Sequence, residues 1–181
     1  MKTKTMVLCA VFAAILCVFS VISIPIGPVP ISMGVFGVML SAVVLGPKKG
    51  AISVFVFILL GCIGLPVFTG FRGGFQVLAG VTGGYIWAYI PMAVIIGLFT
   101  LNPPQNKWIA MLKIFIGCLI GIVVLYILGT IQFMLVKQTD LMTTLSLCVI
   151  PFIPFELGKS IVAVYVGFGI SRALKKSGFL S

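Results

Sequence analysis

The sequence contains no histidine and only two acidic residues, Asp140 and Glu156, among its 181 positions. Acid–base and metal-assisted catalysis most often use histidine, paired carboxylates or a cluster of metal ligands. The chain offers none of these sets, so we expect neither an enzyme nor a cofactor or metal held by this chain. Its five cysteines are scattered through apolar stretches without a CxxC spacing. This pattern argues against a disulfide framework or a zinc site and favours cysteines buried as small hydrophobic residues.

Charge of either sign is scarce, because only 8% of the residues are charged and 61% are hydrophobic. A soluble domain carries roughly 25% charged residues. The composition therefore predicts an integral membrane protein. The formal net charge is +10, but the basic residues flank apolar runs instead of clustering along one face. We therefore do not expect nucleic acid as a partner.

Six apolar stretches are each expected to form a transmembrane helix, all within a single domain over residues 1–181. They cover approximately residues 6–26, 31–45, 51–66, 85–101, 108–136 and 145–170. The second and third stretches are shorter than the ~20 residues that span a bilayer. The distribution of basic residues therefore has to decide whether these two cross the membrane.

If every stretch crosses, nine basic residues fall on one side of the membrane, Arg72 and Lys137 fall on the other, and Lys159 lies within the sixth stretch. The nine are Lys2, Lys4, Lys48, Lys49, Lys107, Lys113, Arg172, Lys175 and Lys176. By the positive-inside rule, both termini are expected to be cytoplasmic. The alternative of a secretory signal peptide is disfavoured, because the first apolar run is too long and no small-x-small cleavage site follows it.

The connections on the outer side differ from ordinary turns. Residues 25–30 contain three prolines, which favour a stiff, extended segment. Residues 64–84 contain seven glycines. An irregular connection of this length is usually a binding loop or lid, and its glycines let the backbone approach a ligand closely. The alternative is a flexible outer loop without contacts.

Glu156 and Lys159 place opposite charges three positions apart in an apolar stretch. An ionised side chain in hydrocarbon costs roughly 2.5–3.5 kcal/mol, so such residues usually face a partner, a cavity or a substrate. Residues three apart share a helix face, and Pro154 suits a first helical turn, near the positive end of the dipole. Together with the outer loops and Arg72, the pair predicts an outward-facing ligand pocket. The alternative is an ion pair that only anchors the helix at the membrane interface.

Small residues recur four positions apart on two of the expected helices. Ala10 and Ala14 lie on the first, and Gly117 and Gly121 lie on the fifth. Such spacing lets helices approach closely in lipid, and packing within the protein is the ordinary explanation. For Ala10 and Ala14, the alternative is a surface on which a partner subunit docks.

Four segments, taken together, resemble the BioY proteins, which are the substrate-binding S components of energy-coupling-factor (ECF) biotin transporters. The segments are PIGPVPIS, GLPVF, AGVTGGY and PFIPFELGKS, and the resemblance covers nearly the whole chain. It implies a six-helix protein of the bacterial cytoplasmic membrane that captures biotin on the outer side. It also implies a transmembrane T component as partner and two ATPase subunits that use ATP, with membrane lipid around the helices.

The resemblance also implies roles for individual residues. Glu156 and Lys159 match the family's Asp-x-x-Lys pair with one extra methylene, and the family's GPTGGY segment lacks its proline here. A carboxylate can accept from a ureido N–H of biotin, and an ammonium group can donate to the ureido oxygen. The other residues expected to contact biotin are Arg72, Gln76, Thr82, Gly83, Tyr85, Phe71 and Phe75. Pro28, Val29 and Pro30 are expected to form a lid, and Ala10 and Ala14 match the AxxxA coupling motif of S components.

Two rival functions remain open at this point. The first keeps the architecture and changes the ligand to another vitamin, such as thiamin or riboflavin. The second is a self-contained secondary transporter or channel that uses Glu156 as an ion site. Secondary transporters often contain repeated halves, and no internal repeat is evident in this sequence.

Overall fold

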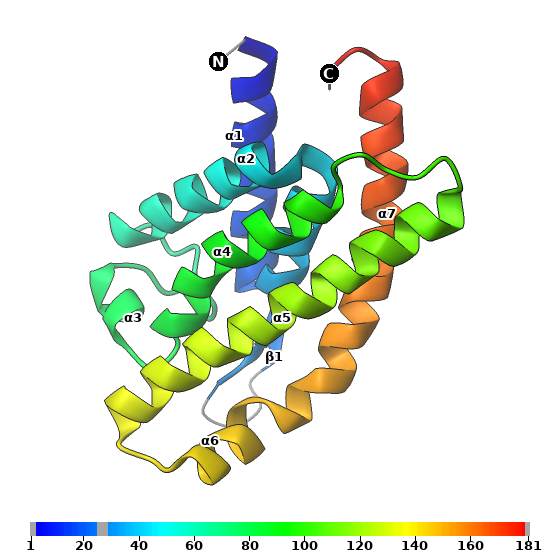
Figure 1. Ribbon diagram of the computed structural model, residues 1–181. Coiled ribbons are helices and arrows are strands. Elements are labelled where there is room, and N and C mark those ends of the chain that lie inside the picture. The colour runs from blue at the N-terminus through cyan, green and yellow to red at the C-terminus, as the bar shows by residue number, and fades with distance from the viewer. Residues whose placement is uncertain (1–2, 25–28, 180–181) are drawn as a thin grey trace.

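The computed structural model describes residues 3–24 and 29–179, so Lys2 and Pro28 lie outside the described residues. The structure is mostly helical. Its elements are α1 (Thr3–Val21), β1 (Ser23–Ile24), β2 (Ile31–Ser32), α2 (Gly34–Cys62), α3 (Phe75–Ala79), α4 (Gly83–Phe99), α5 (Lys107–Lys137), α6 (Leu141–Cys148), the 3-10 helix η1 (Ile150–Phe152) and α7 (Ile153–Lys176). Figure 1 shows the start of α1 and the end of α7 at one end of the molecule, and β1 and α6 at the other.

Four helical stretches among the described residues are long and apolar enough to cross a membrane. They are Thr3–Val21, Gly34–Cys62, Lys107–Lys137 and Leu141–Lys176, and α4 is a shorter apolar helix. This agrees with the integral membrane protein that the composition predicts. The number of spanning segments depends on how the chain breaks within these stretches.

The expected second and third helices form two arms of α2, which breaks at Gly46. Gly46 has φ 78° and ψ −175°, a conformation that glycine adopts readily. Pro47 follows at the start of the second arm, where its fixed φ suits a first helical turn. The five-residue connection expected at residues 46–50 is therefore reduced to a single non-helical residue.

The expected sixth helix is not continuous, which corrects the sequence-based prediction. The chain forms α6, turns through η1 and begins α7 at Ile153. Pro151 and Pro154 cause the break, because proline lacks the N–H group that a helix interior needs and disfavours helical backbone in the residue before it. Asp140 caps α6 by accepting a hydrogen bond from the Thr143 amide (3.1 Å). Hydrogen bonding to the Thr143 side chain, and secondly to its amide, lowers the pKa of the Asp140 carboxyl.

The first helix also ends earlier than expected, at Val21. The chain enters a short antiparallel pairing in which Ser23 lies opposite Ser32, and Ile24 lies opposite Ile31. This pairing brings the chain directly to the start of α2 and positions Ser32 beside α7.

The two small-residue pairs have different surroundings. A methyl group added at Gly117 would lie 2.8 Å from Phe99, and one at Gly121 would lie 3.1 Å from Met92, so this pair packs against α4. Ala10 and Ala14 instead lie on the exposed face of α1, whereas Ala13 between them is buried. Packing within the chain therefore accounts for the glycine pair and leaves Ala10 and Ala14 uncovered.

Candidate functional site

A cavity of about 410 Å³ lies where the β1–β2 pairing, the loop 64–82 and the start of α7 meet α4 and α5. It is lined by Ser23, Val29, Pro30, Ser32, Val35, Phe68, Thr69, Gly70, Arg72, Val77, Val81, Thr82, Tyr85, Ile86, Tyr89, Leu125, Tyr126, Cys148, Phe152 and Glu156. Val29 and Pro30, expected to belong to a lid, thus border the cavity. The position of Pro28 is not described.

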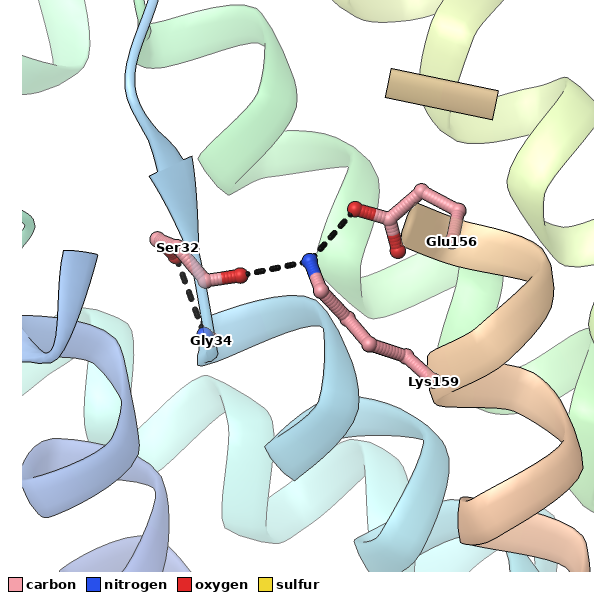
Figure 2. Close-up of polar contacts among 4 residues, drawn as sticks. All are labelled: Ser32, Gly34, Glu156 and Lys159. Carbon is pink, nitrogen blue, oxygen red and sulfur yellow. Dashed lines mark hydrogen bonds and ion pairs between the residues drawn. The ribbon is translucent and has the colours of Figure 1, made fainter. Parts of the chain in front are cut away.

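Glu156 and Lys159 form a buried ion pair beside this cavity. Glu156 lies in the first turn of α7 and is only 4% exposed. The Lys159 ammonium group lies 2.7 Å from Glu156 Oε1 and donates a second hydrogen bond to the main-chain oxygen of Ser32 (2.8 Å). Figure 2 shows the ammonium group between the two acceptors. Removing one partner of such a pair leaves an uncompensated buried charge.

The two residues of the pair have different relations to the cavity. Glu156 lines it, and its second oxygen, Oε2, has no hydrogen-bond partner among residues 3–24 and 29–179. Lys159 does not line the cavity and already uses two of its three N–H donors within the protein. The carboxylate is therefore the half of the pair that faces the cavity, and Lys159 holds it in place.

Three of the chain's four tyrosines line the cavity, namely Tyr85, Tyr89 and Tyr126. The hydroxyl groups of Tyr85 and Tyr126 are buried without a hydrogen-bond partner within the described residues. A buried donor without a partner is costly, so these groups are suited to a polar ligand or to water. Sequence reasoning identified Tyr85 and missed Tyr89 and Tyr126, although Tyr85 and Tyr89 are spaced four apart and share a helix face.

Of the polar residues expected in the loop 64–84, Arg72 and Thr82 line the cavity. Gln76 lies beside it, in a neighbouring hollow of about 440 Å³ that shares Arg72 and Thr82 with the cavity. Arg72 is held by two main-chain hydrogen bonds with Phe68, whose ring is buried against Phe57. This part of the loop is therefore attached to the end of α2.

Phe71 and Phe75, expected as apolar walls of the pocket, do not line the cavity. Their side chains are 72% and 64% exposed. Phe71 projects from the turn closed by the bridge between Phe68 and Arg72, and Phe75 is the first residue of α3. Gly83 does not line the cavity either. A side chain there would collide with the Leu78 carbonyl and the Gln132 amide, so Gly83 serves close packing.

Gln132 is another residue that sequence reasoning missed. From α5, its side-chain amide donates to the main-chain oxygens of Leu78 and Gly80, at 2.8 Å each. These carbonyls stand immediately before Val81 and Thr82, which line the cavity. Gln132 thus fixes the loop to α5. A single glutamine in a long apolar helix was the only available signal.

A second, apolar groove of about 540 Å³ runs between α5, α6 and α7. Glu156 and Tyr126 line both this groove and the cavity. Thr130 lines the groove but not the cavity, and its buried hydroxyl has no hydrogen-bond partner in the part of the chain that the structure describes. The site is therefore separated from the groove by single side chains.

Comparison with known proteins assigns the family. The model of the BioY family matches residues 1–176. The chain belongs to the BioY family. The biotin transporter BioY of Thermotoga maritima is 36% identical over 169 residues, which cover 93% of this chain and 96% of that protein. A probable biotin transporter BioY of Pyrococcus horikoshii is 37% identical over 166 residues, covering 92% and 95% of the two chains.

A solved structure supports the same assignment for the BioY fold. The crystal structure of the S-component for biotin from an ECF-type ABC transporter matches with a TM-score of 0.83 at 33% identity. The match covers 97% of this chain and 92% of that one. The resemblance expected from the sequence motifs is thereby confirmed at the level of family and fold.

Proposed function

We propose that this BioY chain captures biotin outside the cell and delivers it for uptake as the S component of an ECF transporter. Relatives named as biotin transporters and the similar S-component structure support this function. The observation that carries the proposal is the Glu156 carboxylate, which is buried at the cavity wall with one oxygen paired to Lys159 and the other without a hydrogen-bond partner among the described residues. The function is transport, not catalysis.

The chemistry of biotin fits this arrangement. In this proposal Glu156 Oε2 accepts a hydrogen bond from a ureido N–H, and the hydroxyl groups of Tyr85 and Tyr126, which line the same cavity, donate to the ureido oxygen. The Lys159 ammonium group has only its third N–H available for that oxygen, because the other two are bound to Ser32 and Glu156. Apolar residues such as Phe68 offer a surface for the fused rings of biotin.

The biotin carboxylate is assigned to the side of the cavity on which Arg72 and Thr82 lie. Gln76 is placed in the adjoining hollow, where it can contact a ligand that enters or leaves. Phe71 and Phe75 have no place in this proposal as walls of the pocket. Gly83 contributes by permitting the close packing of α4 against Leu78.

The proposed topology has six spanning segments, namely α1, the two arms of α2, α4, α5 and α7, with both termini in the cytoplasm of a bacterial cell. Contacts support the grouping of basic residues at one end. Cys9 on α1 lies 3.6 Å from the Lys49 carbonyl, and Lys113 donates to Leu101 between α4 and α5. The start of α1 and the end of α7 lie at this same end (Figure 1), so the positive-inside rule assigns it to the cytoplasm. The cavity then opens outward.

The exposed face of α1 is proposed to dock on the T component through Ala10 and Ala14. Small residues allow close helix approach in lipid, and the structure leaves both uncovered by this chain. ATP is then used by the two ATPase subunits. The chain itself, a single domain surrounded by lipid, needs no cofactor and no nucleic acid.

Equilibrium binding of labelled biotin to the purified protein tests this function. We expect saturable binding that unlabelled biotin displaces and that thiamin and riboflavin do not. Binding of one of the other vitamins in place of biotin would assign a different ligand. Uptake that continues without ATPase subunits and follows the proton gradient would instead indicate a secondary transporter.

A further inference from the structure

We propose that the loop between α2 and α3 is anchored in the membrane by Phe71 and Phe75, whose rings insert among the acyl chains of the lipid leaflet on the side away from the termini. This inference concerns a lipid-binding surface and goes beyond the proposed capture of biotin. It needs only that the protein is embedded in a bilayer.

The first observation is that the exposed rings belong to an ordered stretch of backbone. Phe68 and Arg72 exchange main-chain hydrogen bonds of 2.9 and 3.3 Å, and the Gly74 amide donates to the Gly61 carbonyl of α2 at 2.7 Å. The Phe68 ring covers Gly61, where an added methyl group would collide with it. The loop is thus folded onto the end of α2, and Phe71 is directed outward by a fixed turn.

The second observation is the backbone conformation of Phe71. Its φ is 56°, in the left-handed region that a bulky residue rarely occupies. Gly70 and Gly74 nearby have φ of 75° and 94°, so the turn already uses glycine where the left-handed conformation is needed. Packing against the described residues can compensate little of the strain at Phe71, since its side chain is 72% exposed. A favourable contact outside the protein explains why an aromatic residue is present at this position.

The third observation identifies the occupant as lipid. The second arm of α2 carries an exposed apolar stripe of Ile52, Phe55 and Leu59, and exposed apolar residues follow it in the chain. They are Ile63, directly after the helix, and Leu65, Phe71 and Phe75 in the loop, which folds back so that Gly73 lies close to the Leu65 carbonyl. The exposed face of a membrane-spanning helix contacts acyl chains, and the same apolar environment therefore extends over the loop. Half-exposed Trp87, near the start of α4, belongs to a residue type that favours the membrane interface, and α3 contacts α4.

The consequence for the site is that side chains within residues 68–72 have three different surroundings. Phe68 points into the core, Arg72 borders the cavity and Phe71 points into lipid. Insertion of Phe71 therefore holds Arg72 in position from the membrane side, as Phe68 does from the core.

The test uses the full-length protein with Trp87 and Trp108 replaced by phenylalanine and a single tryptophan reintroduced. The reporters are Phe71→Trp and Phe75→Trp, with Val123→Trp on the exposed middle of α5 as a lipid reference and Gln105→Trp in the exposed α4–α5 connection as a water reference. Each variant is reconstituted in phosphatidylcholine vesicles that carry bromine either near the glycerol end or near the middle of the acyl chain.

We expect both reporters to emit at shorter wavelength than tryptophan at 105 and to lose fluorescence to the shallow bromine more than to the deep one. Tryptophan at 123 should show the opposite depth preference. Water-like emission without bromine quenching at both 71 and 75 would overturn the proposal. It would also be overturned if quenching disappeared on raising the protein-to-lipid ratio or on assembly with the partner subunits, because a second copy or a partner would then cover the rings.

Discussion

The ammonium group of Lys159 lies 2.8 Å from the main-chain oxygen of Ser32, a residue 127 positions earlier in the chain. The bond joins the last helix to the segment that opens α2, and the same ammonium group holds Glu156 at the cavity wall. The Lys159 side chain thus connects β2, early in the sequence, with α7, late in the sequence, at the proposed ligand site. Its loss should be felt in both stability and binding.

Glu156→Gln and Lys159→Ala are each expected to lower biotin affinity at least tenfold. A buried hydrogen bond to a charged group contributes about 1.5–3 kcal/mol, and 1.4 kcal/mol corresponds to a factor of ten. The two variants should differ in thermal stability without ligand. Either change breaks the buried pair, which costs about 3–5 kcal/mol. Lys159→Ala should be the more destabilising of the two, because glutamine at 156 can still accept a hydrogen bond from the Lys159 ammonium group, which also keeps its bond to Ser32. Calorimetric titration and thermal unfolding measure both effects, and unchanged affinity in both variants would reduce the pair to an anchor.

Tyr126→Phe should weaken biotin binding without destabilising the free protein. The hydroxyl group is buried and has no partner within the described residues, so its removal relieves a cost in the empty state. Loss of one neutral hydrogen bond to the ligand predicts a roughly two- to tenfold lower affinity. Tyr165→Phe is the matched control, because Tyr165 is exposed and does not line the cavity. Equal affinities for the two variants would show that Tyr126 does not contact the ligand.

Gln132→Leu should loosen the loop that ends at Thr82. The Leu78 and Gly80 carbonyls both lose their donor, with an expected destabilisation of about 1–3 kcal/mol. Hydrogen exchange of residues 78–82 should rise, and biotin should dissociate faster. Gln105→Leu, in an exposed connection, serves as the control for the loss of a glutamine. Unaltered exchange at residues 78–82 would contradict a fixing role for Gln132.

Replacing Ala10 and Ala14 with leucine should spare biotin binding by the isolated protein and abolish uptake in cells that also contain the partner subunits. Both positions are exposed on α1, so the added side chains have room in the free protein. Ala13→Leu is the contrasting variant, because Ala13 is buried and overpacking there costs about 1–3 kcal/mol of stability. Uptake that persists with leucine at 10 and 14 would exclude this face as the docking surface.

Features that depend on local sequence were predicted well. The long apolar runs of α4 and α5 were placed within two residues at each end, since length and hydropathy define them. The proximity of Glu156 and Lys159 followed from their spacing on a helix. Pro154 was expected in a first helical turn, and α7 does begin there, but the separate α6 and η1 before it were not expected, because the apolar run from residue 145 continues through the break.

Features that depend on tertiary contacts were not predictable in the same way. The contacts of Gln132 with Leu78 and Gly80 join residues more than 50 positions apart, and no local pattern encodes them. The composition of the 64–84 loop indicated a binding role but not the direction of each side chain. Phe71 and Phe75 were therefore expected to face the ligand, while the structure exposes both, Phe71 in the turn at residues 68–72 and Phe75 at the start of α3.

The apolar groove between α5 and α7 borders Glu156 and Tyr126 on the side opposite to the cavity. If a ligand leaves a polar atom of Glu156 or Tyr126 without a hydrogen bond, water in the groove cannot replace it, because the groove is apolar. The unpaired atom is then costly, since the dielectric constant around it is low. A molecule of similar shape that lacks a donor opposite Glu156 Oε2 is consequently rejected by the full cost of the orphaned oxygen. The side chains of Glu156 and Tyr126, which alone separate the cavity from the apolar groove at this point, thus let the site discriminate between close chemical analogues.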